Sequence, residues 1–177
     1  MKRTKLLLGL LVFSVIMVVS YIYLGGTNEV VISEEQVANY TLVGKDYIGR
    51  YRDTELRDIY FDLKGKVDNG ELKGILTIIN YEMDPDSTKS GFIHQFLGVS
   101  VAENKTQYLE DYSTTVIPVQ AVLKAKVKAH NLVMPKPESV EKQLHSYAKE
   151  RNLVLQNFTI EQYVSDRELD IVIPVIK

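Results

Sequence analysis

The hydrophobic and polar residues of this chain follow different patterns along its length, and each pattern predicts a different element. Residues 6–24 form an unbroken run without a charged side chain. As a helix with a rise of about 1.5 Å per residue, this run reaches about 28 Å, which is long enough to span a bilayer. Beyond it, apolar residues recur at the periods of strands and helices, so we expect one membrane-spanning helix followed by a folded domain.

The second half of the chain has the clearest alternation. TTVIPVQAVLKAKVKAH, at residues 114–130, repeats apolar residues at period two and predicts one long strand. A helix is expected from Pro137, because proline suits the first helical turn and apolar residues then recur at helical spacing. Residues 158–164 and 169–176 predict two more strands, separated by the turn-like SDRE. The order is therefore strand, helix, strand, strand.

The first half can be divided in the same order. Residues 40–51 alternate like a strand, and residues 54–67 carry apolar side chains along one side of a helix. Two further strands are expected at residues 74–81 and 96–101. Because the same order occurs twice, the pattern indicates an internal duplication.

A short sequence also repeats at the third element of each half, as TIINYEMD at residues 77–84 and TIEQYVSD at residues 159–166. Alternation places Glu161 and Tyr163 on one face of the strand, and the repeat assigns Tyr81 to the matching face. We expect helices on the other face, because an ionised carboxylate must meet water, a basic side chain or a cationic ligand. An exposed or salt-bridged glutamate on an open sheet face would give the same pattern.

The composition narrows the chemistry. The chain has 177 residues, of which 45% are hydrophobic and 25% charged, and this suits one domain with a buried core. It has no cysteine, which excludes disulfides, thiolate catalysis and a lipid-modified N-terminal cysteine. The three histidines, His94, His130 and His145, lack the close spacing of a metal site, so we expect neither a metal nor a cofactor.

The charges around the apolar run predict its orientation. A basic head, residues 1–5, precedes the expected anchor at residues 6–24, and a polar tether at residues 25–39 carries only acidic charges. The positive-inside rule then puts the N-terminus in the cytoplasm and the domain on the exterior, which is the periplasm in a Gram-negative cell. The alternative is secretion after signal cleavage, although cleaved signals have shorter apolar cores of about 7–15 residues.

The charge of the exported part bears on its partners. Without the three basic residues of the head, Lys and Arg fall from 21 to 18 against 23 acidic residues, a net charge of 18 − 23 = −5. A net negative charge and the lack of an extended basic run do not favour binding to the phosphates of nucleic acid, so we expect no nucleic-acid partner.

Residues 40–177 resemble the GyrI-like effector-binding family. The resemblance is carried by NYEMDP at residues 80–85 followed by FLGVSV at residues 96–101, and by IEQYVSD at residues 160–166 followed by LDIVIPV at residues 169–175. It implies an α+β domain made of duplicated β-α-β-β (SHS2-like) units. These units would form a central antiparallel sheet with helices on one face and a ligand cleft between the halves.

The resemblance also implies a ligand site. In drug-binding relatives a glutamate of the cleft neutralises lipophilic cations, and Glu161 matches its position, with Tyr163 and Tyr81 matching the motif tyrosines. Tyr147 and Phe96 are further candidates. The chain departs from the family in lacking tryptophan, and a membrane span takes the place of the helix-turn-helix domain found in transcription-factor relatives.

Three functions remain open from the sequence. The first is a membrane-anchored, non-enzymatic module that binds a small lipophilic or cationic molecule in the cleft. The second is a membrane-tethered protein-interaction scaffold with the same fold, whose protein partner the sequence does not name. The third is a hydrolase of electrophilic small molecules that uses Glu161 as a base towards water.

Overall fold

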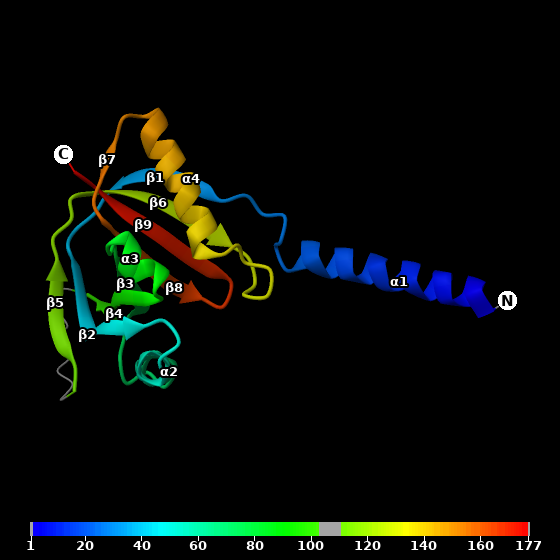
Figure 1. Cartoon of the computed structure of the whole chain (residues 1–177), viewed down its shortest axis with the longest axis horizontal. Helices are drawn as coiled ribbons and strands as arrows, with labels where there is room; N and C mark the ends of the chain where they lie inside the picture. Colours follow the sequence, from blue (N-terminus) through cyan, green and yellow to red (C-terminus); the bar gives the residue numbers. More distant parts are fainter. Residues whose placement is uncertain (1, 103–110, 177) are drawn as a thin grey trace.

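The computed structural model describes residues 2–102 and 111–176, and of residues 2–5 it describes the backbone only. The helices of this part are α1 (Lys2–Tyr23), α2 (Thr54–Asp68), α3 (Pro85–Lys89) and α4 (Pro137–Glu150). The strands are β1 (Val31–Gln36), β2 (Tyr40–Arg50), β3 (Ile75–Tyr81), β4 (Phe92–Val101), β5 (Ser113–Ile117), β6 (Ala121–Lys128), β7 (Val154–Leu155), β8 (Phe158–Ser165) and β9 (Glu168–Ile176). Figure 1 shows a globular α+β part from which α1 projects as a separate rod.

The sheet confirms the predicted duplication. Its strands lie in the order β1-β6-β9-β8-β3-β4-β2-β5, with β7 paired to β9, and the described pairs are antiparallel. The half β2-α2-β3-β4 and the half β6-α4-β8-β9 therefore place their strands in mirrored order, and the halves meet where β3 pairs with β8. In that pair Ile78 is opposite Glu161, and Ile79 is opposite Ile160.

Helices α2 and α4 pack on the same face of the sheet, as predicted. Helix α2 begins after Asp53, whose carboxylate accepts the Glu55 backbone N–H at 3.2 Å as an N-cap, and Ile59 and Leu63 point into the sheet. Helix α4 begins with Pro137 at its first turn. Its buried residues Val140, Leu144 and Ala148 pack against β6 and β9.

The opposite face of the sheet is also a core, which corrects one expectation. We expected helices opposite Glu161, but both α2 and α4 lie on the Glu161 face. The chain segments that join β1 to β2 and β5 to β6 meet over the other face, where the Val37 N–H donates to Gln120 O at 3.1 Å and the Val119 N–H donates to Asn39 Oδ1 at 3.2 Å. Beneath them lies an apolar cluster of Leu42, Ile79, Phe96, Ile117, Val119, Val122, Ile160 and Val172.

The long strand predicted at residues 114–130 is two strands in the structure. Strand β5 pairs with β2 at one edge of the sheet, whereas β6 pairs with β9 and β1 at the other. The break falls at Pro118, because proline has no N–H to donate to a strand ladder. The alternation continues across the break since Ile117 and Ala121 are both buried, so periodicity alone did not reveal it.

The tether predicted at residues 25–39 is shorter in the structure. Residues 31–36 form β1, which pairs with β6, so the folded part begins before Tyr40. The link between α1 and β1 also touches the domain: the His130 N–H donates to Leu24 O at 2.8 Å, and Asn28 Nδ2 donates to Lys128 O at 2.6 Å. Helix α1 is thus followed by a short connection that is hydrogen-bonded to the domain.

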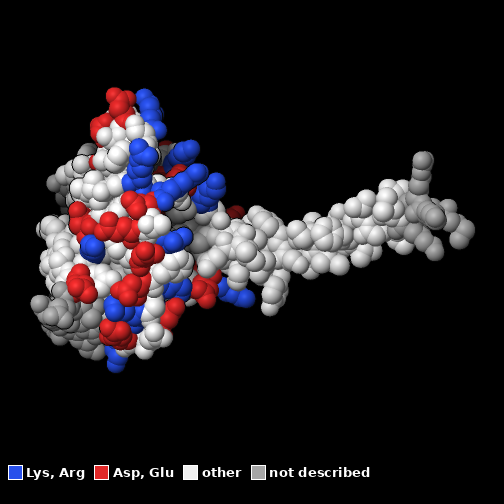
Figure 2. All heavy atoms as spheres, turned by 60° about the horizontal axis from the view of Figure 1, so that its bottom comes forward, with Lys and Arg blue, Asp and Glu red and all other residues white. Residues whose placement is uncertain are grey.

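Helix α1 confirms the predicted helix but not its location in a membrane. Its window Leu6–Tyr23 has a mean hydropathy of 2.5, and none of it is buried. In the described part of the chain it is the one helix long and apolar enough to cross a bilayer, a property that signal sequences share. Figure 2 shows the contrast between its uncharged surface and the globular part, where acidic and basic side chains are interspersed on the face in view.

Candidate functional site

Glu161 lies at the centre of the sheet, close to where the two halves meet. Its side chain is 8% exposed, and its neighbours across the sheet are Ile78 on β3 and Ile171 on β9. Partners directly opposite in antiparallel strands point to the same face, so Glu161 stands between two aliphatic side chains beneath the helices. Burying a charged carboxylate in such surroundings costs folding free energy unless polar partners form hydrogen bonds with it.

Two hydrogen bonds fix the carboxylate of Glu161. Asn80 Nδ2 donates to Oε1 at 2.7 Å, and the Tyr163 hydroxyl donates to Oε2 at 2.7 Å. Gln95 Nε2 in turn donates to Asn80 Oδ1, which orients the amide of Asn80 towards Glu161. The chain Gln95–Asn80–Glu161–Tyr163 therefore runs across strands β4, β3 and β8, and every bond in it stabilises one orientation of the carboxylate.

No described basic side chain neutralises Glu161. Among the described residues, no Lys, Arg or His forms an ion pair with it. Burial raises the pKa of its carboxyl, the hydrogen bonds from Tyr163 and Asn80 lower that pKa, and the negative charges of Glu141 and Glu138 raise it further. The net pKa is raised, so the site favours either a proton or a cation at this position.

The carboxylate faces a cleft between α2 and α4. The cleft has a volume of about 940 Å³, within the range of small-molecule pockets. Its floor includes Ile78, Asn80, Leu97, Glu161 and Tyr163, and its walls come from the first turns of α4 and from α2. Its aromatic lining consists of Tyr51, Tyr60, Phe61 and Tyr163.

The aromatic rings are arranged edge to face. Tyr60 meets Tyr163 with ring centroids 6.3 Å apart at 80°, and it meets Phe61 at 5.5 Å and 82°. Burial raises the pKa of Tyr163, as does the neighbouring charge of Glu161, and burial also raises the pKa of Tyr60. Both phenols are therefore neutral at physiological pH, and their ring faces offer negative electrostatic potential to a cation.

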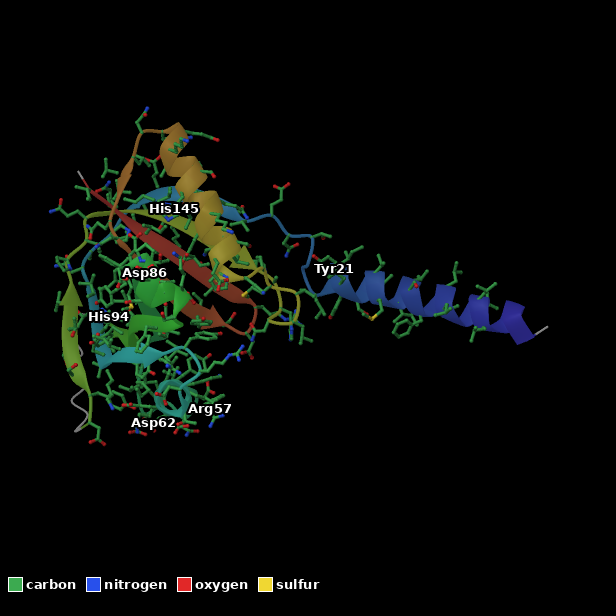
Figure 3. All side chains as sticks on the ribbon, viewed as in Figure 1. Tyr21, Arg57, Asp62, Asp86, His94 and His145 are labelled. Atoms are coloured by element: carbon green, nitrogen blue, oxygen red, sulfur yellow. The ribbon has the colours of Figure 1, made fainter. Side chains whose placement is uncertain are left out.

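The basic residues of the cleft lie at its rim. Arg52 and Arg57 line it, and Arg57 lies 3.8 Å from Asp58 on the exposed side of α2. Figure 3 shows Arg57 and Asp62 at α2, at the outer edge of the molecule. Because both arginines are exposed to solvent, they do not neutralise the carboxylate of Glu161 at the floor of the cleft.

A second, smaller cavity adjoins the cleft between α3 and α4. This side cavity has a volume of about 510 Å³, and it shares Asn80, Thr88, Ile93 and Glu141 with the cleft. Among the described residues, no group of three or more His, Asp or Glu side chains is arranged to hold a metal ion in either place. The arrangement suits binding of an organic molecule.

Comparisons with known proteins give the fold and leave the family open. No protein-family model matches the chain, and no curated protein matches its sequence. The C-terminal domain of EcmrR superposes with a TM-score of 0.57 at 12% identity, covering 84% of this chain and 98% of that domain. The structure of SAV2435 bound to tetraphenylphosphonium superposes with a TM-score of 0.52 at 14% identity, covering 82% and 94%. A hydrolase from Listeria innocua superposes with a TM-score of 0.51 at 9% identity, covering 82% and 91%.

The chain shares the fold of these proteins. All three matches cover more than four fifths of this chain and more than nine tenths of the matched chain. At identities below 15% the likeness concerns the backbone, and the function of the cleft has to be argued from its own residues.

The predicted site residues are only partly brought together. Glu161 and Tyr163 share one face, as the alternation predicted, and the structure shows that they are hydrogen-bonded. Tyr81 lies on the opposite face, because it pairs with Phe158 and not with a residue of the Glu161 face. Its ring packs on His94, with centroids 4.4 Å apart, and it lines the side cavity but not the cleft.

The two remaining candidates lie away from Glu161. Phe96 is 3% exposed in the apolar cluster on the opposite face of the sheet. Tyr147 is half-buried against the core cluster beneath α4, the guanidinium of Arg151 stacks on its ring at 4.5 Å, and it lines neither the cleft nor the side cavity. Phe96 is thus a core residue, and Tyr147 packs at the edge of the core beneath α4.

Sequence reasoning missed most of the lining of the cleft, including two residues that contact Glu161 and Tyr163. Asn80 is a polar residue in an otherwise apolar strand, and the register β3–β8 was the information needed to place it beside Glu161. Tyr60 stood among the apolar residues predicted for the inner side of α2 and read as core, yet its ring reaches Tyr163. A polar residue inside an apolar strand was the one usable signal.

Proposed function

We propose that the domain is a GyrI-like module that binds a small lipophilic cation in the cleft between α2 and α4. The observation that carries this proposal is Glu161, a carboxylate that is 8% exposed and has hydrogen-bond donors but no described cationic partner. A monovalent organic cation supplies the missing charge. The surrounding rings and aliphatic side chains supply apolar contact, so charge and shape select the same class of ligand.

The hydrogen bonds to Glu161 serve this function by preorganisation. Asn80 and Tyr163 hold the carboxylate in place before a ligand arrives, so binding requires little reordering at the charged centre. Tyr163 and Tyr60 then form one wall of the site at right angles to each other. The structural similarity to SAV2435, whose structure holds tetraphenylphosphonium, supports the ligand class.

We further propose that α1 anchors this module in a membrane with the domain outside the cytoplasm. The length and apolarity of Leu6–Tyr23 support the span, and the basic residues before it support the orientation. The short connection to β1 then keeps the cleft close to the bilayer, where lipophilic cations accumulate. In this proposal the module binds its ligand without catalysing a reaction.

The hydrolase function is the second candidate, and one observation favours it. The raised pKa of Glu161 suits a general base, and Tyr163 is within hydrogen-bond distance of it. The fold is shared with a hydrolase from Listeria innocua. Incubation of the protein with an epoxide, followed by detection of the diol, separates this function from simple binding.

Thermal melting of the full-length protein in lipid nanodiscs tests the proposed function. A ligand that binds only the folded state stabilises it by RT ln(1 + [L]/Kd), so tetraphenylphosphonium should raise the melting temperature in a concentration-dependent way. Triphenylphosphine oxide, which is neutral and similarly aromatic, should have a much smaller effect. Equal shifts from both compounds would contradict a charge-based site, and no shift from either would favour the scaffold function.

A further inference from the structure

The side cavity adjoins the cleft at Glu141. It lies where β3 ends and β8 begins, and Figure 3 shows His145 of α4 and His94 of β4 on either side of Asp86 of α3 in this region. Tyr81 and Phe158 supply its aromatic surface, with ring centroids 6.0 Å apart. A molecule in the cleft therefore has a second space beside it, lined by both polar and aromatic side chains.

Glu141 stands at the junction of the two spaces. Its side chain lines both the cleft and the side cavity, and it is half-buried on the inner side of α4. Burial raises the pKa of its carboxyl, the Thr159 hydroxyl lowers it, Glu138 raises it and His145 lowers it. No described Lys or Arg forms an ion pair with Glu141.

The structure thus contains two carboxylates in adjoining spaces, and among the described residues neither forms an ion pair with Lys or Arg. The negative charge of Glu141 contributes to the raised pKa of Glu161, because the two carboxylates repel each other. One cation at Glu161 leaves Glu141 unbalanced. Two cationic centres joined by a flexible apolar chain would balance both groups and would place the chain along Ile93, which lines both spaces.

We propose that the preferred ligand is an elongated molecule with two cationic groups, one held by Glu161 in the cleft and the other by Glu141 towards the side cavity. This inference rests on the proposed function and extends it to the shape and charge of the ligand. The second cationic group lies in the part of the side cavity that Tyr81 and Phe158 line, where β3 ends and β8 begins, which places Tyr81 beside the ligand although its ring packs on the opposite face of the sheet. Asn80, common to both spaces, orients the Glu161 end.

Isothermal titration calorimetry with a matched pair of probes tests this inference on the full-length protein in nanodiscs. Decamethonium carries two trimethylammonium groups on a ten-carbon chain, and decyltrimethylammonium carries one on a chain of the same length. The wild type should bind decamethonium about tenfold more tightly, which is the effect of about 1.4 kcal/mol from a second ion contact. Glu141→Gln should abolish this difference and change the affinity for decyltrimethylammonium by less than about twofold.

Glu138→Gln is the matched control, because Glu138 is on the same helix and lines the cleft but not the side cavity. It should change the affinity for either probe by less than about twofold and preserve the preference for decamethonium. If decyltrimethylammonium binds but decamethonium binds no more tightly, or if Glu141→Gln keeps the preference, the two-centre ligand is overturned while the cation-binding function stands. If neither probe binds, the proposed function fails and the inference falls with it.

Discussion

The Tyr163 hydroxyl donates a 2.7 Å hydrogen bond to Glu161 Oε2, two residues earlier on the same strand. Residues two apart on a strand point to the same face, so the pair follows from the alternation of β8. The bond stabilises the folded state, because it satisfies one oxygen of a buried carboxylate that no described basic residue neutralises.

Tyr163→Phe removes this donor and keeps the ring that contacts Tyr60. We expect the substitution to lower the free energy of unfolding by about 1–3 kcal/mol at pH 8, because Oε2 of Glu161 is left without a partner. Chemical denaturation measures this change. In the Glu161→Gln background the effect of Tyr163→Phe should be clearly smaller, and equal effects in both backgrounds would mean that the hydrogen bond contributes little.

Stability should depend on pH through Glu161. A carboxyl whose pKa is raised by folding binds more protons in the native state, so the free energy of unfolding falls as the pH rises from the usual glutamate pKa of about 4.3 through the raised value. Glu161→Gln removes this contribution. We therefore expect the melting temperature of Glu161→Gln to exceed that of the wild type by more at pH 8 than at pH 4.

The comparison with Glu161→Gln is needed because Glu141 also has a raised pKa and titrates in the same direction. The difference between wild type and variant isolates the contribution of Glu161. In a protein of this length, each kcal/mol of difference in the free energy of unfolding shifts the melting temperature by about 2–4 °C. A difference that is the same at both pH values would show that Glu161 titrates as an ordinary exposed glutamate.

The ion pair between Lys124 and Asp170 should stabilise the opposite face of the sheet. Lys124 Nζ lies 2.9 Å from Asp170 Oδ2, the Asp170 side chain is 7% exposed, and the other carboxylate oxygen of Asp170 has no hydrogen-bond partner. Lys124→Met leaves Asp170 buried and unpaired, which costs about 3 kcal/mol. Calorimetry should show a melting temperature lower by roughly 6–12 °C. Asp170→Asn added to Lys124→Met should recover part of the loss, and additive losses would argue against the pair.

Strand β1 should be needed for a stable domain. It pairs with β6, and Ile32 packs against the core beneath α4. A fragment of residues 27–177 should unfold cooperatively, whereas a fragment of residues 40–177 should melt at a lower temperature because β6 becomes an unprotected edge strand. Identical melting curves would mean that residues 31–36 act as a tether, as the sequence alone suggested.

The sequence revealed the elements better than it revealed their pairing. The helix predicted at residues 54–67 is α2, and the order strand, helix, strand, strand holds in both halves. The single strand predicted at residues 114–130 is divided into β5 and β6, because these two segments pair with strands that lie far apart in the sheet. Such long-range pairing leaves no mark in local periodicity, and Pro118 was the local clue.

The site was half predictable for the same reason. Glu161 and Tyr163 follow from alternation within one strand, whereas Tyr81 was placed from the echo of TIINYEMD and TIEQYVSD. In the structure Ile78, and not Ile79, is the partner of Glu161, so the echo is offset by one residue from the pairing. A shift of one residue moves a side chain to the other face of a sheet, and this put Tyr81 outside the cleft.

The affinity of the full-length protein in nanodiscs for tetraphenylphosphonium at pH 8, measured by calorimetry beside Glu161→Gln, tests the central claim most directly. The two proteins differ by one oxygen exchanged for an NH₂ group, so membrane partitioning of the ligand is the same in both. We expect saturable binding to the wild type and an affinity at least about tenfold lower in Glu161→Gln, or about 1.4 kcal/mol. Equal affinity in the two proteins would contradict a cation site built around Glu161.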